Sequence, residues 1–177
     1  MDPLFASWSN FFVITGSSAA ALTGLMFVVL TLIAGQERRS GMRAGLEAFT
    51  SPILVHFCAA LLISAVLAAP WRSVLGPTIV LSLAGAYGVV YAFRVMVRLA
   101  RVRSGSGYAA DAEDWTWYGL LPLLAYLAVL GGALSLRSHG AAAVFALAGA
   151  SLFLIFIAIR NAWDTVTFIS IPDDEEV

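Results

Sequence analysis

Long apolar stretches alternate with short polar segments along the chain, and this alternation predicts membrane-spanning helices. The first stretch, Phe11 to Ala34, is 24 residues long and carries no charged side chain. About 20 consecutive apolar residues are enough for a helix to cross the hydrocarbon core of a bilayer. Four later stretches are also long enough, so we predict spans at about residues 11–34, 46–69, 75–98, 115–136 and 141–168.

These spans predict an all-α fold: an integral membrane bundle of five transmembrane helices, formed as a single domain by residues 1–177. The first span carries small and hydroxyl side chains at helical spacing, which let helix backbones approach closely in lipid. We therefore expect this helix at the centre of the bundle. Its predicted packing residues are Gly16, Ala20, Thr23 and Gly24.

The arginines predict the orientation of the bundle. Seven of the ten lie in or just before the first and third loops, at Arg38, Arg39, Arg43, Arg94, Arg98, Arg101 and Arg103. The loops on the opposite side contain only Arg72 and Arg137. Because positive charge marks the cytoplasmic side of a membrane protein, we predict an outside N-terminus and a cytoplasmic C-terminus. Residues 172–177 are predicted to form an acidic, disordered tail.

The composition agrees with a membrane protein and narrows the possible partners. Hydrophobic residues make up 60% of the chain and charged residues only 12%, and the mean hydropathy is +0.89. A soluble domain has about a quarter of its residues charged. The net charge of −1 provides no basic field to recruit nucleic acid. We expect the lipid bilayer as a partner, and neither a cofactor nor a metal ion.

The third span carries a polar face that is unusual for lipid. Tyr87, Tyr91, Arg94 and Arg98 recur at spacings of four, three and four residues, which places them on one side of a helix. An ionisable group near the centre of a membrane helix costs about 2.5–3.5 kcal/mol, so such groups tend to face protein or water.

The last span carries a second polar group at its cytoplasmic end. Arg160 and Asp164 are four residues apart and can pair directly, with Asn161 beside them; Arg94 or Glu47 is an alternative partner for one of the two charged residues. We hypothesise that the two polar faces meet around a vestibule open to the cytoplasm. The alternative is interfacial anchoring, in which the arginines extend to lipid headgroups.

His56 lies near the middle of the second span. One interpretation is a proton relay or a ligand. The other is a neutral imidazole that hydrogen-bonds to a neighbouring helix. The second histidine, His139, lies in a turn on the opposite side of the membrane, which argues against a haem clamp.

Prolines and glycines mark special positions in the spans. Pro52 and Pro122 either interrupt their helices or start them, and an interruption at Pro122 would free the carbonyl of Tyr118. Gly85 and Gly88 in the third span predict a close contact with another helix.

Catalytic motifs are missing from the sequence. It contains no H-E-x-x-H metal motif, no Walker A loop and no serine nucleophile elbow. We therefore predict that the protein is not an enzyme.

Two short segments carry a resemblance to a known group of proteins. Ala20 to Val28 and Ile159 to Asp164 resemble segments of small, multi-spanning bacterial membrane proteins, some of which are labelled modulators of the FtsH protease. The resemblance implies a bacterial inner-membrane location. It also implies that Arg160, Asn161, Trp163 and Asp164 belong to a recurring feature.

Small size and the absence of soluble domains favour a non-enzymatic accessory or regulatory protein. Such a protein would form a homo-oligomer or pack against another membrane complex. The alternative is a homo-oligomeric ion channel or small-solute transporter, in which the polar faces of the third and fifth spans line the path and the arginines favour anions.

Overall fold

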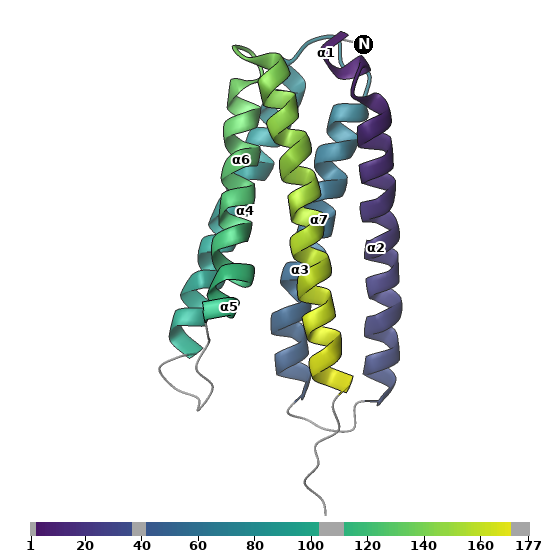
Figure 1. Ribbon diagram of the computed structural model, residues 1–177, viewed down its shortest axis with the longest axis vertical. Coiled ribbons are helices and arrows are strands. Elements are labelled where there is room, and N and C mark those ends of the chain that lie inside the picture. Colours follow the sequence, from purple (N-terminus) through teal and green to yellow (C-terminus); the bar gives the residue numbers. More distant parts are fainter. Residues whose placement is uncertain (1–2, 37–41, 103–111, 171–177) are drawn as a thin grey trace, which may run out of the picture.

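Every element in the described part of the chain is helical in the computed structural model (Figure 1). The structure describes the backbone of residues 3–36, 42–102 and 112–170, and the side chains of residues 3–31, 52–100 and 112–167. The helices are α1 (Pro3–Ala6), α2 (Ser9–Gln36), α3 (Met42–Ala68), α4 (Leu75–Val102), α5 (Ala112–Asp114), the π-helix η1 (Trp115–Leu120), α6 (Leu121–Ser135) and α7 (Gly140–Ser170). The predicted tail, and the side chains of the first-loop and third-loop arginines, lie outside the described residues.

Four of these helical segments are long and apolar enough to cross a membrane: Ser9–Thr31, Leu75–Ala100, Ala112–Ser135 and Gly140–Thr167. In α3, the described side chains form a shorter apolar segment, Pro52–Ala68. Large apolar side chains remain exposed along the outer faces of the long helices. A soluble monomer rarely exposes so much contiguous apolar surface, and a bilayer covers it. The structure therefore indicates a membrane protein.

The helices pack in an order that differs from their order in the chain. α2 packs against α3, α3 against α7, α7 against α6, and α6 against α4. In Figure 1, α3 and α7 therefore lie in the middle, with α2 at one edge. α1 lies at the end of the bundle opposite to the end at which α7 finishes (Figure 1).

The position of α2 corrects the expectation that the first span is central. α2 buries a single face, formed by Phe12, Thr15, Gly16, Ala19 and Met26, and leaves the rest of its surface open. Lipid tails are as apolar as a leucine-rich helix, so an uncharged sequence is equally stable at the edge or in the middle. Length and hydropathy therefore do not determine which helix is central.

The four predicted packing residues of α2 share one side of the helix, but only part of that side is buried. Gly16 faces α3 closely, since a Cβ atom at this position would lie 3.0 Å from Cβ of Ser64. Thr23 is half-buried, whereas Ala20 and Gly24 are exposed. A Cβ atom at Gly24 would meet nothing within 4 Å. Within one protomer, only Gly16 provides a close helix contact.

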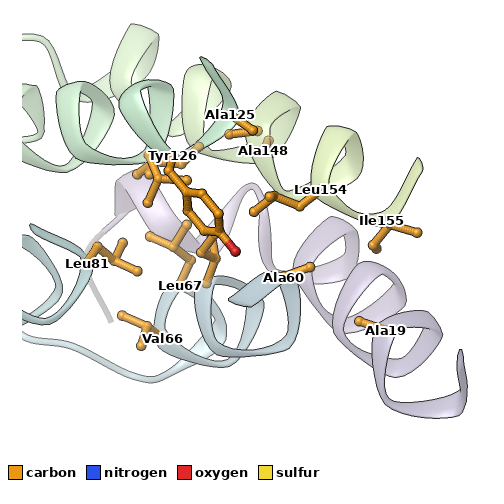
Figure 2. Packing of buried hydrophobic residues seen from close by; sticks show 14 of the residues in the cluster. Ala19, Ala60, Val66, Leu67, Leu81, Ala125, Tyr126, Ala148, Leu154 and Ile155 are labelled. Carbon is orange, nitrogen blue, oxygen red and sulfur yellow. The ribbon is translucent and has the colours of Figure 1, made fainter. Parts of the chain in front are cut away.

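α4 and α6 approach more closely than side chains larger than hydrogen would allow. A Cβ atom at Gly85 would lie 2.8 Å from the backbone nitrogen of Leu130, and one at Gly88 would lie 2.0 Å from Cδ1 of Tyr126. The predicted close contact through both glycines is confirmed. Figure 2 shows the Tyr126 ring among the buried residues, pointing from α6 toward Leu67.

Candidate functional site

A group of polar side chains gathers where the end of α7 meets α5 and η1. The Arg160 guanidinium forms ion pairs with Glu113 and with Asp164, and its Nη1 lies 3.3 Å from Asp164 Oδ1. The same guanidinium lies over the Trp117 ring, 5.5 Å from the ring centroid. Of the two anionic partners, Asp164 is the one that the helical spacing predicts. Two carboxylates and an aromatic face therefore stabilise one cation.

Glu113 is the residue of this group that the sequence analysis missed. It lies in α5, in the polar segment that precedes the fourth span, where acidic residues are ordinarily solvated. The side chains of Arg160, Glu113 and Asp164 are 32%, 60% and 47% exposed. The ion pairs are thus open to competition from solvent and from other charged groups.

Asn161 anchors the buried side of the group. Its side chain is fully buried, and Nδ2 donates to the backbone carbonyl oxygen of Trp117 at 3.4 Å. Tyr118 extends this network, because its hydroxyl donates to Asp164 Oδ2 at 3.4 Å. Asn161 Oδ1 has no hydrogen-bond partner in the described part of the chain. We define the α7 cluster as Glu113, Tyr118, Arg160, Asn161 and Asp164.

A local break in helical register explains why Asn161 is needed. In η1 the backbone N–H of Leu121 bonds to the carbonyl of Thr116, five residues earlier. In the same register the backbone amide of residue 122 would bond to the carbonyl of Trp117. Residue 122 is proline, however, and has no N–H to donate. A freed carbonyl within a membrane is stabilised by a neighbouring helix. Asn161 supplies that donor, so the wide turn ties η1 to α7.

The π register changes the predicted role of Pro122. The wide turn frees the Trp117 carbonyl, one residue before the expected Tyr118, because the Leu121 amide bonds to Thr116 and residue 122 has no amide. π-turns of this kind are frequent at functional sites. Pro52, by contrast, lies within α3 and not at its start.

The polar face of α4 forms a separate group. Tyr87 and Tyr91 stack with ring centroids 6.3 Å apart and an angle of 23° between the ring planes. Arg94 and Arg98 follow on the same helix and are exposed. A hollow of about 340 Å³ is lined by Ala86, Tyr87, Val90, Tyr91 and Arg94. We define the α4 face as Tyr87, Tyr91, Arg94 and Arg98.

The seven predicted vestibule residues lie on two helices, α4 and α7, that each pack against α6. α6 packs against α4 on one side and against α7 on another. Within the described residues, no hydrogen bond or ion pair joins the α4 face to Arg160, Asn161 or Asp164. The predicted pairing of Arg160 with Asp164 is observed and Arg94 is not part of it, whereas the side chain of Glu47, the other alternative partner, lies outside the described residues.

His56 joins α3 to α6 through a buried contact. Its Nδ1 lies 2.9 Å from the Tyr126 hydroxyl, and the two ring centroids are 5.6 Å apart. His56 is 1% exposed, and Nε2 has no hydrogen-bond partner among the described side chains. The contact corresponds to the interpretation of His56 as an imidazole hydrogen-bonded to a neighbouring helix. Cys58, two residues later, is exposed.

The described residues provide interhelical charge pairs and hydrogen bonds. No group of three or more histidine, cysteine, aspartate or glutamate side chains that could hold a metal ion is found among them. No family model, curated protein or solved structure matches this chain. The functional conclusions therefore depend on the residues and their geometry.

Glu113 and Asp164 both pair with Arg160, so each carboxylate should partly compensate for the loss of the other. We expect Asp164→Asn alone to lower the free energy of unfolding by less than about 1 kcal/mol, because Arg160 keeps Glu113 and the pairs are partly solvated. The double variant Glu113→Gln/Asp164→Asn should cost more than the sum of the singles, since Arg160 then has no anion. Unfolding in mixed detergent micelles measures all three variants. Strict additivity would contradict a shared cation.

Proposed function

We propose that the protein is a non-enzymatic, multi-pass protein of the bacterial inner membrane that acts as a homo-oligomeric accessory or regulatory subunit. In this proposal, α3 crosses the bilayer together with the four other long helical segments. The N-terminus is outside and the C-terminus is cytoplasmic. The arginine distribution along the sequence supports this orientation. The resemblance to small bacterial membrane proteins supports the location.

The observation that carries the proposal is an exposed face of small residues on α7, which we call the α7 groove. It consists of Ala142, Ala146 and Gly149, all exposed and spaced at four and three residues. A Cβ atom at Gly149 would meet nothing within 4 Å. Small residues at this spacing let a second helix approach closely, which is the main source of helix association in lipid. The face is therefore suited to a protein partner.

The α7 cluster supports an accessory role over a transport role. Arg160 is already compensated by two carboxylates. Because these pairs are partly exposed, a charged segment of a partner protein can compete for Arg160, Glu113 or Asp164. If a partner replaced one of these ion pairs, α5 and η1 would be held less tightly against α7. Binding of a partner at the α7 cluster could in this way change the packing of these helices.

Oligomer formation through the α7 groove is tested with Gly149→Leu, with Gly24→Leu on α2 as the matched control. Both glycines are exposed and have open space around them. We expect Gly149→Leu to weaken association of the purified protein in liposomes roughly tenfold or more, because an interface that fits glycine is overpacked by leucine. Single-molecule photobleaching counts the subunits. Wild-type protein that is monomeric, or an equal effect of Gly24→Leu, would contradict the proposal.

The second candidate function is an oligomeric anion channel, and the exposed α4 face favours it. An oligomer that contacts itself through α4 would place Arg94 and Arg98 around a central path, where arginines favour anions. Chloride flux into proteoliposomes tests this function. Flux that Arg94→Gln reduces would support a channel, and the absence of flux would leave the accessory role.

A further inference from the structure

The α4 face combines three features that together describe a ligand site. The first is shape: the hollow of about 340 Å³ along α4 opens to the outside of the bundle and is lined on one side by Tyr87 and Tyr91. Tyr87 is 64% exposed, so the aromatic wall faces the surroundings and not the core. Aromatic rings of this kind offer a large apolar area against which an acyl chain can pack.

The second feature is uncompensated positive charge. Arg94 lines the hollow, and Arg98 lies one turn further along the same face. Neither arginine forms a hydrogen bond or ion pair in the described part of the chain. Arg160 shows the contrast, because two carboxylates hold it. Within the described residues these two guanidinium groups are therefore available to an anionic ligand.

The third feature is depth. At the standard helical rise, Arg94 lies about 28 Å along α4 from Leu75. The hydrocarbon core of a bilayer is about 30 Å thick. With Leu75 at one boundary of the core, Arg94 reaches the phosphate layer of the other leaflet. The tyrosines of the α4 face then lie at the level of the acyl chains.

We infer that the α4 face binds an anionic glycerophospholipid, with its phosphate held by Arg94 and Arg98 and an acyl chain lying against Tyr87 and Tyr91 in the hollow. Guanidinium groups bind phosphate oxygens through two parallel hydrogen bonds, which a fixed helical position favours. Basic pockets beside transmembrane helices are known to recognise anionic headgroups. The site requires only that α4 lies in the bilayer, so it is independent of the accessory role.

The first test measures lipid binding to the intact purified protein by native mass spectrometry, with phosphatidylglycerol and phosphatidylcholine as probes. We expect Arg94→Gln to weaken phosphatidylglycerol binding about fivefold and the double variant with Arg98→Gln about 30-fold. Phosphatidylcholine binding should not change. Arg137→Gln is the matched control, since Arg137 is also exposed but lies in the turn before α7, at the other end of the bundle. Equal binding of both lipids, or an equal effect of Arg137→Gln, would overturn the inference.

A second measurement uses unmodified protein and so does not depend on how the variants fold. Phosphatidylglycerol with a photoactivatable acyl chain is cross-linked in vesicles that also contain phosphatidylcholine, and the protein is digested with trypsin. Adducts concentrated in the peptide 73–94 are expected. Adducts spread evenly over the outer helices would contradict a defined site. A third measurement, on a variant with a photoreactive residue in place of Tyr87, would also overturn the inference if it captured a second copy of the chain, because the face would then be a protein interface.

Discussion

Gly88→Ala should destabilise the protein by about 2–3 kcal/mol, although alanine is the better helix former by about 0.5–1 kcal/mol. The added Cβ would lie 2.0 Å from a ring atom of Tyr126. The ring cannot simply rotate away, because it is fully enclosed and its hydroxyl contacts His56. Either α4 moves away from α6, or Tyr126 leaves its position and gives up the contact with α3.

The matched control for this prediction is Gly24→Ala on α2. It is the same substitution in a helix of similar length, but the new Cβ would meet nothing within 4 Å. We expect Gly24→Ala to be neutral or to stabilise the protein by up to about 1 kcal/mol. Unfolding in mixed detergent micelles, monitored by circular dichroism, compares the two variants. A Gly88→Ala protein as stable as Gly24→Ala would show that α4 and α6 are not held at this distance.

The buried contact at Tyr126 also explains why a single position has such an effect. Tyr126 extends from α6 toward α3, while its ring fills the space that Gly88 of α4 leaves. Tyr126 thus contacts both α3 and α4, and it adds a polar link to the direct packing of α3 against α4. Displacing the ring leaves the His56 imidazole buried without its hydroxyl partner, and an unpaired buried polar group costs about 1–3 kcal/mol.

The sequence predicts those features that depend on one helix at a time. The lengths of the apolar runs place the helices within a few residues of their observed bounds, because a membrane helix satisfies nearly all of its backbone polar groups internally. Helical spacing places Arg160 beside Asp164. Gly85 and Gly88 are recognised as a close-packing pair because only glycine leaves room for another backbone or ring.

Features that depend on the packing of two helices cannot be predicted from the length or periodicity of either helix alone. The edge position of α2 is invisible in the sequence, because lipid and protein interior are equally apolar. The contact of Arg160 with Glu113 joins residues 47 positions apart, and no spacing rule connects them. The same holds for the separation of Arg94 from the α7 cluster, since helical periodicity defines the faces of α4 and α7 but not which helix lies between them.

Asn161→Leu should lower the free energy of unfolding by about 1–3 kcal/mol, because the Trp117 carbonyl then loses its side-chain donor in a buried position. Leucine keeps the branching of asparagine at Cγ but is larger, so the loss combines the missing hydrogen bond with a cost of overpacking. The variant Ser151→Ala on the same helix is the control. It removes a buried hydroxyl that donates to the Ala148 carbonyl, an acceptor in the interior of α7, and it should cost less.

The cost of Asn161→Leu should fall when Pro122 is replaced by alanine. Alanine restores an amide, and either that amide in the π register or the amide of Leu121 in an α register then bonds to the Trp117 carbonyl. The side-chain donor of Asn161 becomes dispensable in this background. A double-mutant cycle in detergent micelles should therefore show a coupling energy of about 1 kcal/mol or more between positions 122 and 161. Equal costs of Asn161→Leu in both backgrounds would mean that Asn161 does not compensate for the proline, and the tie between η1 and α7 would then need another origin.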